Sequence, residues 1–172
     1  SHTYFSQRLR LHYVDWGNPD APPMILIHGG RDHCRNWDWV AEQFRDDYHI
    51  IAPDLRGHGD SQWMVGGAYS QIDYVYDIAQ LLLQKQMSPV TVIGHSLGGS
   101  ISLLYTALHA ANVKKLVAIE GMGPPPSMIA ERFNQPAEKR LHNWFSDLRK
   151  SSARIVKRLS LIHISEPTRH TR

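Results

Sequence analysis

The sequence has 172 residues, 42% hydrophobic and 20% charged, which fits one ordinary globular domain and excludes a disordered or low-complexity chain. Its 19 basic and 16 acidic residues leave a formal net charge of +3, too balanced to favour nucleic acid or a membrane surface as a partner. The single cysteine excludes an internal disulfide, and no apolar run approaches the roughly 18 residues of a membrane-spanning helix.

The first part of the chain alternates between short apolar runs and turns. Residues 4–16 alternate partly between apolar and polar side chains, which predicts a strand or hairpin, antiparallel and at the sheet edge. Residues 24–27 are an apolar run typical of a buried strand, and the loop 28–30 (HGG) follows it. The next helix is expected to begin at a cap on Asn36. Its apolar face comprises Trp37, Val40, Ala41 and Phe44.

The middle of the chain predicts one more strand and a long helix. Residues 48–53 indicate a buried strand, and the polar, glycine-rich loop 54–61 (DLRGHGDS) follows it. Ser70, with Asp73 three residues later, has the spacing of a capping box at a helix start. This helix is expected to bury Ile72, Val75, Ala79 and Leu82.

A Gly-x-Ser-x-Gly motif at residues 94–98 lies between a β-branched run at 90–93 and a helix-forming run at 101–108. A strand, a tight turn and a helix in this order are typical of a nucleophile elbow, which exposes a serine hydroxyl at the top of a sheet. The free N–H groups at the start of such a helix favour an anion beside Ser96.

After this motif the sequence predicts one more strand and then the end of the core domain. Residues 114–119 predict a buried strand, and three prolines at 124–126 mark the end of the core. The alternation of strands and helices predicts an α/β fold whose sheet is mostly parallel, with helices on both faces. Residues 1–123 would form this core, and helical spacing returns within residues 124–158.

Four of these features, in this order, resemble the α/β-hydrolase family: the 28–30 loop, the 54–61 loop, the 94–98 motif and the strand leading into the prolines. The resemblance covers residues 5–158. It implies the α/β-hydrolase fold, with a sheet of about eight strands in the complete protein and about the first six here. It also implies that residues 124–158 begin a helical cap over the active site.

By this resemblance Ser96 is the catalytic nucleophile, activated by a histidine that accepts its proton. The N–H groups of Leu97 and Gly30 would form the oxyanion hole. Relatives order the triad as serine, acid and histidine, so the histidine, and in most relatives the acid, is expected beyond the sixth strand. Glu120 is an alternative acid, because some relatives place theirs there; otherwise its carboxylate bonds the nearby loop.

Other polar residues at strand ends are expected to order loops rather than to react: His28, Asp54 and His58. The sequence shows no metal-ligand spacing of His, Cys and carboxylates, so we expect no metal, and the resemblance implies no cofactor. Trp37 and Trp39 would line the substrate pocket or belong to the core.

The last residues resemble something other than a protein family. Residues 159–169 match, at every position, one translated frame of the transposase adapter used in short-read DNA library preparation. We therefore exclude 159–172 from fold and function, the alternative being a natural amphipathic tail. The natural product is expected to continue differently after Arg158, and the chain by itself, without the catalytic histidine, to show little or no turnover.

The predicted function is that of a serine hydrolase acting on an ester, lactone or thioester. A serine at position 96 disfavours a dehalogenase or epoxide hydrolase, whose relatives carry aspartate there. Carbon–carbon bond hydrolysis, cofactor-free haloperoxidation and a non-catalytic binding role remain alternatives within the same fold. The expected partner is a small-molecule substrate, with no nucleic acid or membrane span, and the absence of a secretory signal pattern predicts a cytoplasmic location.

Overall fold

The computed structural model describes residues 1–121. The predictions for the cap at 124–158 and the tail at 159–172 fall outside the described residues and stay predictions. Within residues 1–121, no helix has both the length and the apolar character that crossing a bilayer requires.

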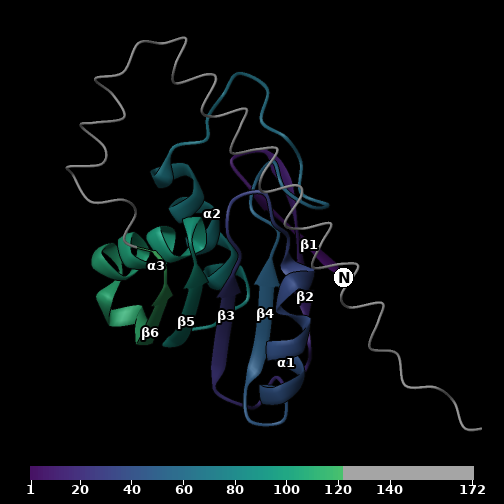
Figure 1. Cartoon of the computed structure of the whole chain (residues 1–172), viewed down its shortest axis with the longest axis vertical. Helices are drawn as coiled ribbons and strands as arrows, with labels where there is room; N and C mark the ends of the chain where they lie inside the picture. The colour runs from purple at the N-terminus through teal and green to yellow at the C-terminus, as the bar shows by residue number, and fades with distance from the viewer. Residues whose placement is uncertain (122–172) are drawn as a thin grey trace, which may run out of the picture. The chain divides into compact units, whose positions relative to one another are not determined.

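A six-stranded sheet organises the described residues, and its strands stand in the order β1-β2-β4-β3-β5-β6 (Figure 1). The strands β2, β4, β3, β5 and β6 occupy the predicted runs. The predicted burial of residues 114–119 is wrong, because β6 is the edge strand of the described sheet and none of its residues is buried. Their bounds are β1 His2–Ser6, β2 Leu9–Asp15, β3 Pro23–Ile27, β4 His49–Pro53, β5 Val90–His95 and β6 Val113–Ile119.

The sheet is mostly parallel, as predicted. Strands β4, β3, β5 and β6 pair in parallel, whereas β1 pairs with β2, and β2 with β4, antiparallel. Gln7 and Arg8, both at positive φ, form the tight turn that joins β1 to β2. Residues 4–16 are therefore a hairpin at the sheet edge, which is one of the two predicted arrangements.

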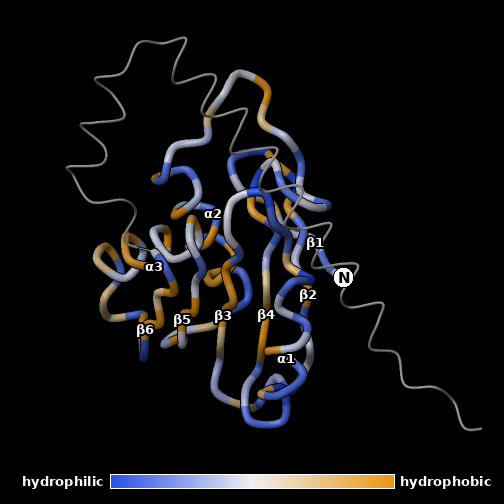
Figure 2. Tube along the Cα trace, in the orientation of Figure 1, coloured by the Kyte–Doolittle hydropathy of each residue, from blue (hydrophilic) through white to orange (hydrophobic). Residues whose placement is uncertain are grey.

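Helices cover both faces of this sheet, and each face has its own core. Successive residues of β3 point to opposite sides: Ile25 and Ile27 pack under α2 and α3, whereas Met24 and Leu26 pack under α1. Figure 2 shows the central strands β3 and β4 coloured hydrophobic along much of their length. The helices are the 3₁₀ turn η1 Cys34–Trp37, α1 Asp38–Phe44, α2 Gln71–Gln84, α3 Leu97–Leu108 and the 3₁₀ turn η2 Ala110–Asn112.

The helix predicted to begin at Asn36 starts differently. A 3₁₀ turn precedes it, His33 caps that turn by accepting the Arg35 N–H, and α1 begins at Asp38 without a side-chain cap. The Asn36 amide bonds Asp32 instead of a helix N–H group, so the predicted cap is wrong. Trp37 is buried in the core under α1, whereas Trp39 is 85% exposed.

The capping box of α2 is confirmed, but its predicted buried face is confirmed only in part, since Val75 and Leu82 are buried and Ile72 is not. Ser70 accepts the Asp73 N–H, and the Asp73 carboxylate accepts the Ser70 N–H. Ile72, predicted to be buried, is 58% exposed. The buried residues of the helix are Tyr74, Val75, Asp77, Ile78, Leu81 and Leu82.

A buried ion pair explains the rotation of α2. The guanidinium of Arg56, which is 0% exposed, grips the Asp77 carboxylate through two hydrogen bonds, Nε–Oδ2 at 2.6 Å and Nη2–Oδ1 at 2.8 Å. Ile72 is five residues from Asp77, about 140° around a helix of 3.6 residues per turn. Turning Asp77 inward to meet Arg56 therefore turns Ile72 outward.

Candidate functional site

Ser96 occupies the sharp turn between β5 and α3. Its φ of 51° and ψ of −114° form a strained backbone conformation for a residue with a side chain. Its N–H donates to the Ile119 carbonyl of β6 at 2.8 Å, and its carbonyl accepts the Ser100 N–H at 3.0 Å. Although Ser96 is the N-cap of α3, its hydroxyl makes no capping hydrogen bond. The turn is thus held by backbone contacts, and the hydroxyl is free of the capping role.

Two glycines make this turn possible by letting backbone approach backbone. A Cβ placed on Gly94 would come closer than 3.0 Å to the Gly98 carbonyl and to the Ser102 hydroxyl. A Cβ on Gly98 would come equally close to the Ile27 and His28 carbonyls at the end of β3. The first turn of α3 therefore packs directly against the backbone where the 28–30 loop begins.

The 28–30 loop lies beside the Ser96 turn, as the predicted oxyanion hole requires. A Cβ built on Gly29 would lie 3.3 Å from the Ser96 Cβ, and one built on Gly30 would lie 3.8 Å from the Leu97 Cδ2. Gly30 is exposed, while Ser96 and Leu97 are half-buried. These three predicted site residues thus gather at one accessible point, at the C-terminal ends of the neighbouring parallel strands β3 and β5.

His28 is buried and orders this loop, as predicted. Its Nε2 accepts the Leu55 N–H at 3.0 Å, so Nδ1 carries the proton and donates it to the Gly29 carbonyl at 2.7 Å. The Gly29 carbonyl and the Gly30 N–H belong to one planar peptide unit and point in opposite directions. By holding the carbonyl, His28 sets the direction of the Gly30 N–H.

Burial lowers the pKa of His28, so the folded protein keeps the ring neutral where the unfolded chain protonates it. Because the folded-state pKa is the lower one, the free energy of unfolding should fall as pH drops below the unfolded value of about 6.5. One such group contributes a slope of at most about 1.4 kcal/mol per pH unit. Urea unfolding of the full chain at pH 7, 6 and 5 should show a shallower slope for His28→Gln. The variant His2→Gln, on the exposed edge strand, should keep the parent slope, and identical slopes for all three proteins would contradict the assignment.

Glu120 directly follows the last residue of β6, close to the Ser96 turn. Its φ of 53° is unusual for a residue with a side chain. Its carboxylate lies 3.8 Å from Nε2 of His95, the residue before Ser96, and the two side chains are 82% and 42% exposed. At this exposure the pair adds little stability. Within residues 1–121 the partner of Glu120 is therefore His95, and its role as the acid stays a prediction.

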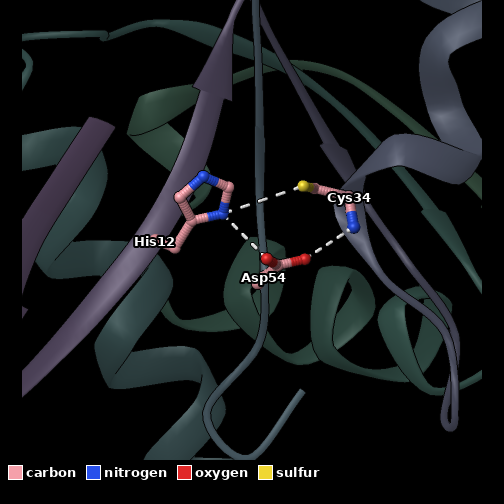
Figure 3. A group of neighbouring side chains, drawn as sticks. All are labelled: His12, Cys34 and Asp54. Carbon is pink, nitrogen blue, oxygen red and sulfur yellow. Dashed lines mark hydrogen bonds and ion pairs between the residues drawn. The ribbon is translucent and has the colours of Figure 1, made fainter. Parts of the chain in front are cut away.

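Asp54 gathers three segments that lie far apart in the sequence (Figure 3). Its Oδ1 accepts the Cys34 N–H at 2.7 Å, while its Oδ2 accepts His12 Nδ1–H at 2.8 Å and the Asp60 N–H at 2.9 Å. Burial alone would raise the pKa of Asp54, but these hydrogen bonds hold it below its usual value. The predicted loop-ordering role is confirmed. The sequence analysis did not predict that His12 binds Asp54, because the two residues are 42 positions apart and no local motif connects them.

His12, Cys34 and Asp54 also bring a nitrogen, a sulfur and an oxygen atom within 4.8 Å of one another. A metal would need the Cys34 side chain as a thiolate. Burial is the main cause that raises the pKa of this thiol far above its usual value, and the nearby Asp54 raises it further. Both oxygens of Asp54 already accept N–H groups. The cluster fits a hydrogen-bonded anchor better than a metal centre.

Two hollows differ in their relation to Ser96. An apolar groove of about 670 Å³ between α2 and α3 is lined by residues such as Val75, Leu82 and Tyr105, and includes neither Ser96 nor the 28–30 loop. A smaller hollow of about 230 Å³ includes His95, Trp37 and Asp32, and so adjoins the Ser96 turn. Only the smaller hollow is close to the chemistry predicted for Ser96.

Comparisons with known proteins agree with this geometry. A family model described as alpha/beta hydrolase fold matches residues 22–170. A probable serine hydrolase of Drosophila melanogaster is 34% identical over 111 residues, which are 63% of this chain and 34% of that protein. A carboxylesterase structure from the thaumarchaeon Nitrososphaera gargenis aligns with a TM-score of 0.67 and 28% identity, covering 76% of this chain and 52% of that one. An epoxide hydrolase of Bacillus megaterium aligns with a TM-score of 0.70 and 28% identity, covering 84% and 51%.

The chain spans about a third of the length of the curated relatives it matches and about half of these two solved chains. The family model nevertheless covers most of its residues, and the sheet, the Ser96 turn and the 28–30 loop are all present. The chain therefore belongs to the α/β-hydrolase fold family.

Proposed function

We propose that the complete protein is a serine hydrolase that cleaves a carboxylic ester, lactone or thioester, with Ser96 as the nucleophile. The observation that carries the proposal is the geometry of the Ser96 turn. Ser96 has a strained backbone at the start of α3, its hydroxyl makes no capping hydrogen bond, and the 28–30 glycine loop lies beside it. The arrangement is that of a nucleophile elbow.

The same turn supplies the electrostatics that acyl transfer needs. When the Ser96 oxygen attacks a carbonyl carbon, the carbonyl oxygen becomes an anion that requires hydrogen-bond donors. We assign these donors to the N–H groups of Leu97 and Gly30. The positive end of the α3 dipole adds to their effect, since Leu97 is the first residue of the helix.

The proton of Ser96 must pass to a histidine, and the leaving group must later take it up. Following the family order, we place this histidine, and the acid that orients it, downstream of residue 121 in the complete protein. Glu120 is the second candidate for the acid, supported by its position at the end of β6 beside the Ser96 turn.

The residue type at position 96 helps to distinguish between the reactions that this fold catalyses. The relatives include epoxide hydrolases as well as a probable serine hydrolase and a carboxylesterase. A serine at this position favours acyl transfer over epoxide opening. Carbon–carbon bond hydrolysis and cofactor-free haloperoxidation would use the same serine, and a binding protein would not react at all.

The test is covalent labelling of the complete protein with a fluorophosphonate, in which the Ser96 oxygen bonds to phosphorus and fluoride leaves. We expect labelling at Ser96 and hydrolysis of p-nitrophenyl acetate. Both should fall by at least about 10³-fold in Ser96→Ala, because loss of the nucleophile leaves only binding and the oxyanion hole.

Ser100→Ala is the matched control, because Ser100 lies one turn later in α3 and its hydroxyl donates to the Gly121 carbonyl. This variant should keep both labelling and hydrolysis. Labelling that persists in Ser96→Ala would overturn the assignment of the nucleophile. Labelling of Ser96 without turnover of any ester, lactone or thioester would favour the carbon–carbon hydrolase or haloperoxidase alternative, and no labelling at all would favour the binding protein.

A further inference from the structure

The loop that carries Gly30 is held at both ends by two adjacent residues. Before the loop, the Leu55 N–H donates to Nε2 of His28 at 3.0 Å. After it, Asp54 Oδ1 accepts the Cys34 N–H at 2.7 Å. Residues 54 and 55 therefore form a clamp that fixes the start and the end of the segment 28–34.

This segment needs such a clamp because its backbone is strained and exposed. Arg31 has a φ of 62°, in the left-handed region that a residue with a side chain rarely adopts. Gly30, Arg31 and His33 are exposed, so little packing holds the middle of the segment in place. The position of the Gly30 N–H therefore depends on the hydrogen bond from His28 to the Gly29 carbonyl and on the hydrogen bonds at the two ends.

The clamp is itself anchored in the sheet. His12 on β2 donates from Nδ1 to Asp54 Oδ2 at 2.8 Å, and the Asp54 N–H donates to the His12 carbonyl at 2.9 Å. His12 and Asp54 are 7% and 2% exposed. The carboxylate is thus fixed by β2 on one oxygen and free to fix the Cys34 N–H with the other (Figure 3).

From these contacts we infer that Asp54, supported by His12, is a positioning residue that holds the Gly30 N–H in place as an oxyanion donor. This inference rests on the proposed function, because it needs an oxyanion at Ser96. The Asp54 carboxylate has its described contacts with His12, Cys34 and Asp60 rather than with Ser96, so it acts through the Cys34 N–H on the segment that contains Gly30.

The test compares Asp54→Asn with Ser61→Ala in the complete protein. The asparagine keeps the size of the side chain but has one accepting oxygen for the three N–H groups that Asp54 serves. Ser61 belongs to the same network, since its hydroxyl donates to the Asp54 carbonyl and accepts the His12 N–H, but it has no bond to residues 28–34 among the described contacts. Its loss should destabilise the network without releasing the Gly30 segment.

The readouts are the rate constant for fluorophosphonate labelling of Ser96 in the folded protein and the separate values of kcat and KM on p-nitrophenyl acetate. We expect Asp54→Asn to lower the labelling rate and kcat by about 10- to 100-fold with little change in KM, approaching the 10²- to 10³-fold cost of losing one oxyanion donor. Ser61→Ala should change both by less than about threefold, even where its thermal midpoint falls, as expected of a substitution remote from the reacting atoms.

Equal labelling rates in the two variants, or an effect of Asp54→Asn on KM and thermal midpoint alone, would overturn the positioning role. Failure of the parent protein to label at Ser96 is a different result, because it would reject the proposed function itself. The folded fraction of each variant, measured by near-ultraviolet circular dichroism, separates loss of fold from loss of rate.

Discussion

Replacing Asp77 with Asn is expected to lower the free energy of unfolding of the full chain by about 3–5 kcal/mol, the usual cost of breaking one side of a buried ion pair. The reason is that the Arg56 guanidinium stays charged and has no route to solvent, since it is 0% exposed. The asparagine would offer the guanidinium one neutral oxygen, and the other partners of Arg56 are the Ala68 carbonyl and the Gln7 amide oxygen, both at 2.9 Å, with Asp73 at 3.5 Å. Neutral acceptors and one more distant carboxylate do not replace a bidentate carboxylate.

The measurement is urea unfolding of the parent and the variant at neutral pH. Asp38→Asn is the matched control, because Asp38 pairs with Arg35 at 3.4 Å with the two side chains 39% and 56% exposed. This surface pair should be worth no more than about 1 kcal/mol. Equal losses in the two variants would contradict the buried pair. The double variant Arg56→Met with Asp77→Leu should recover much of the lost stability, because it leaves no buried charge.

The same ion pair shows where prediction of the fold from sequence succeeds and where it fails. The start of α2 was predicted because Ser70 and Asp73 form a capping box. Hydrogen bonds between residues so close in the sequence can be recognised from a short motif. The face that it buries depends on Arg56, 21 residues away, which draws Asp77 inward. Hydrophobic periodicity carries no information about such a partner, so the predicted face was rotated toward Ile72.

The prediction of where α1 begins failed for a related reason. Asn36 has the side chain of a helix cap, but the Cys34 N–H is already bound by Asp54, and a 3₁₀ turn forms there before the α-helix begins. The strands were easier to predict. Short β-branched runs such as 90–93 are typical of strands buried on both faces in a parallel sheet.

The candidate site likewise has residues that could be predicted from the sequence and contacts that could not. The turn at Ser96 and Leu97 could be predicted because the motif, the strand before it and the helix after it are contiguous. The 28–30 loop, far away in the sequence, was linked to this turn only through the family resemblance. The supporting contacts could not be predicted: His12, Cys34 and Asp54 lie 20 to 42 residues apart and meet only when β2 and β4 pair. The histidine that would accept the Ser96 proton is predicted to lie beyond the described residues.

Replacing Gly98 with Ala is expected to disrupt the folding of the chain. Intrinsic helix propensity alone would favour alanine by about 1 kcal/mol in a helix interior. Gly98 is buried, however, and the new Cβ would come closer than 3.0 Å to the Ile27 and His28 carbonyls. Both obstacles are backbone atoms at the end of β3, so no side-chain rotation relieves the overlap. The cost should exceed the ~1–3 kcal/mol of ordinary overpacking.

Gly30→Ala provides the control, because the added Cβ meets nothing closer than the Leu97 side chain at 3.8 Å, which is ordinary van der Waals contact. Its stability should stay within about 1 kcal/mol of the parent. Soluble yield, near-ultraviolet circular dichroism and urea unfolding of both variants make the comparison. Gly98→Ala should lose the cooperative transition that Gly30→Ala retains. A Gly98→Ala variant as stable as the parent would mean that α3 can move away from β3, and the Ser96 turn would then be too loosely held to keep its hydroxyl facing the 28–30 loop.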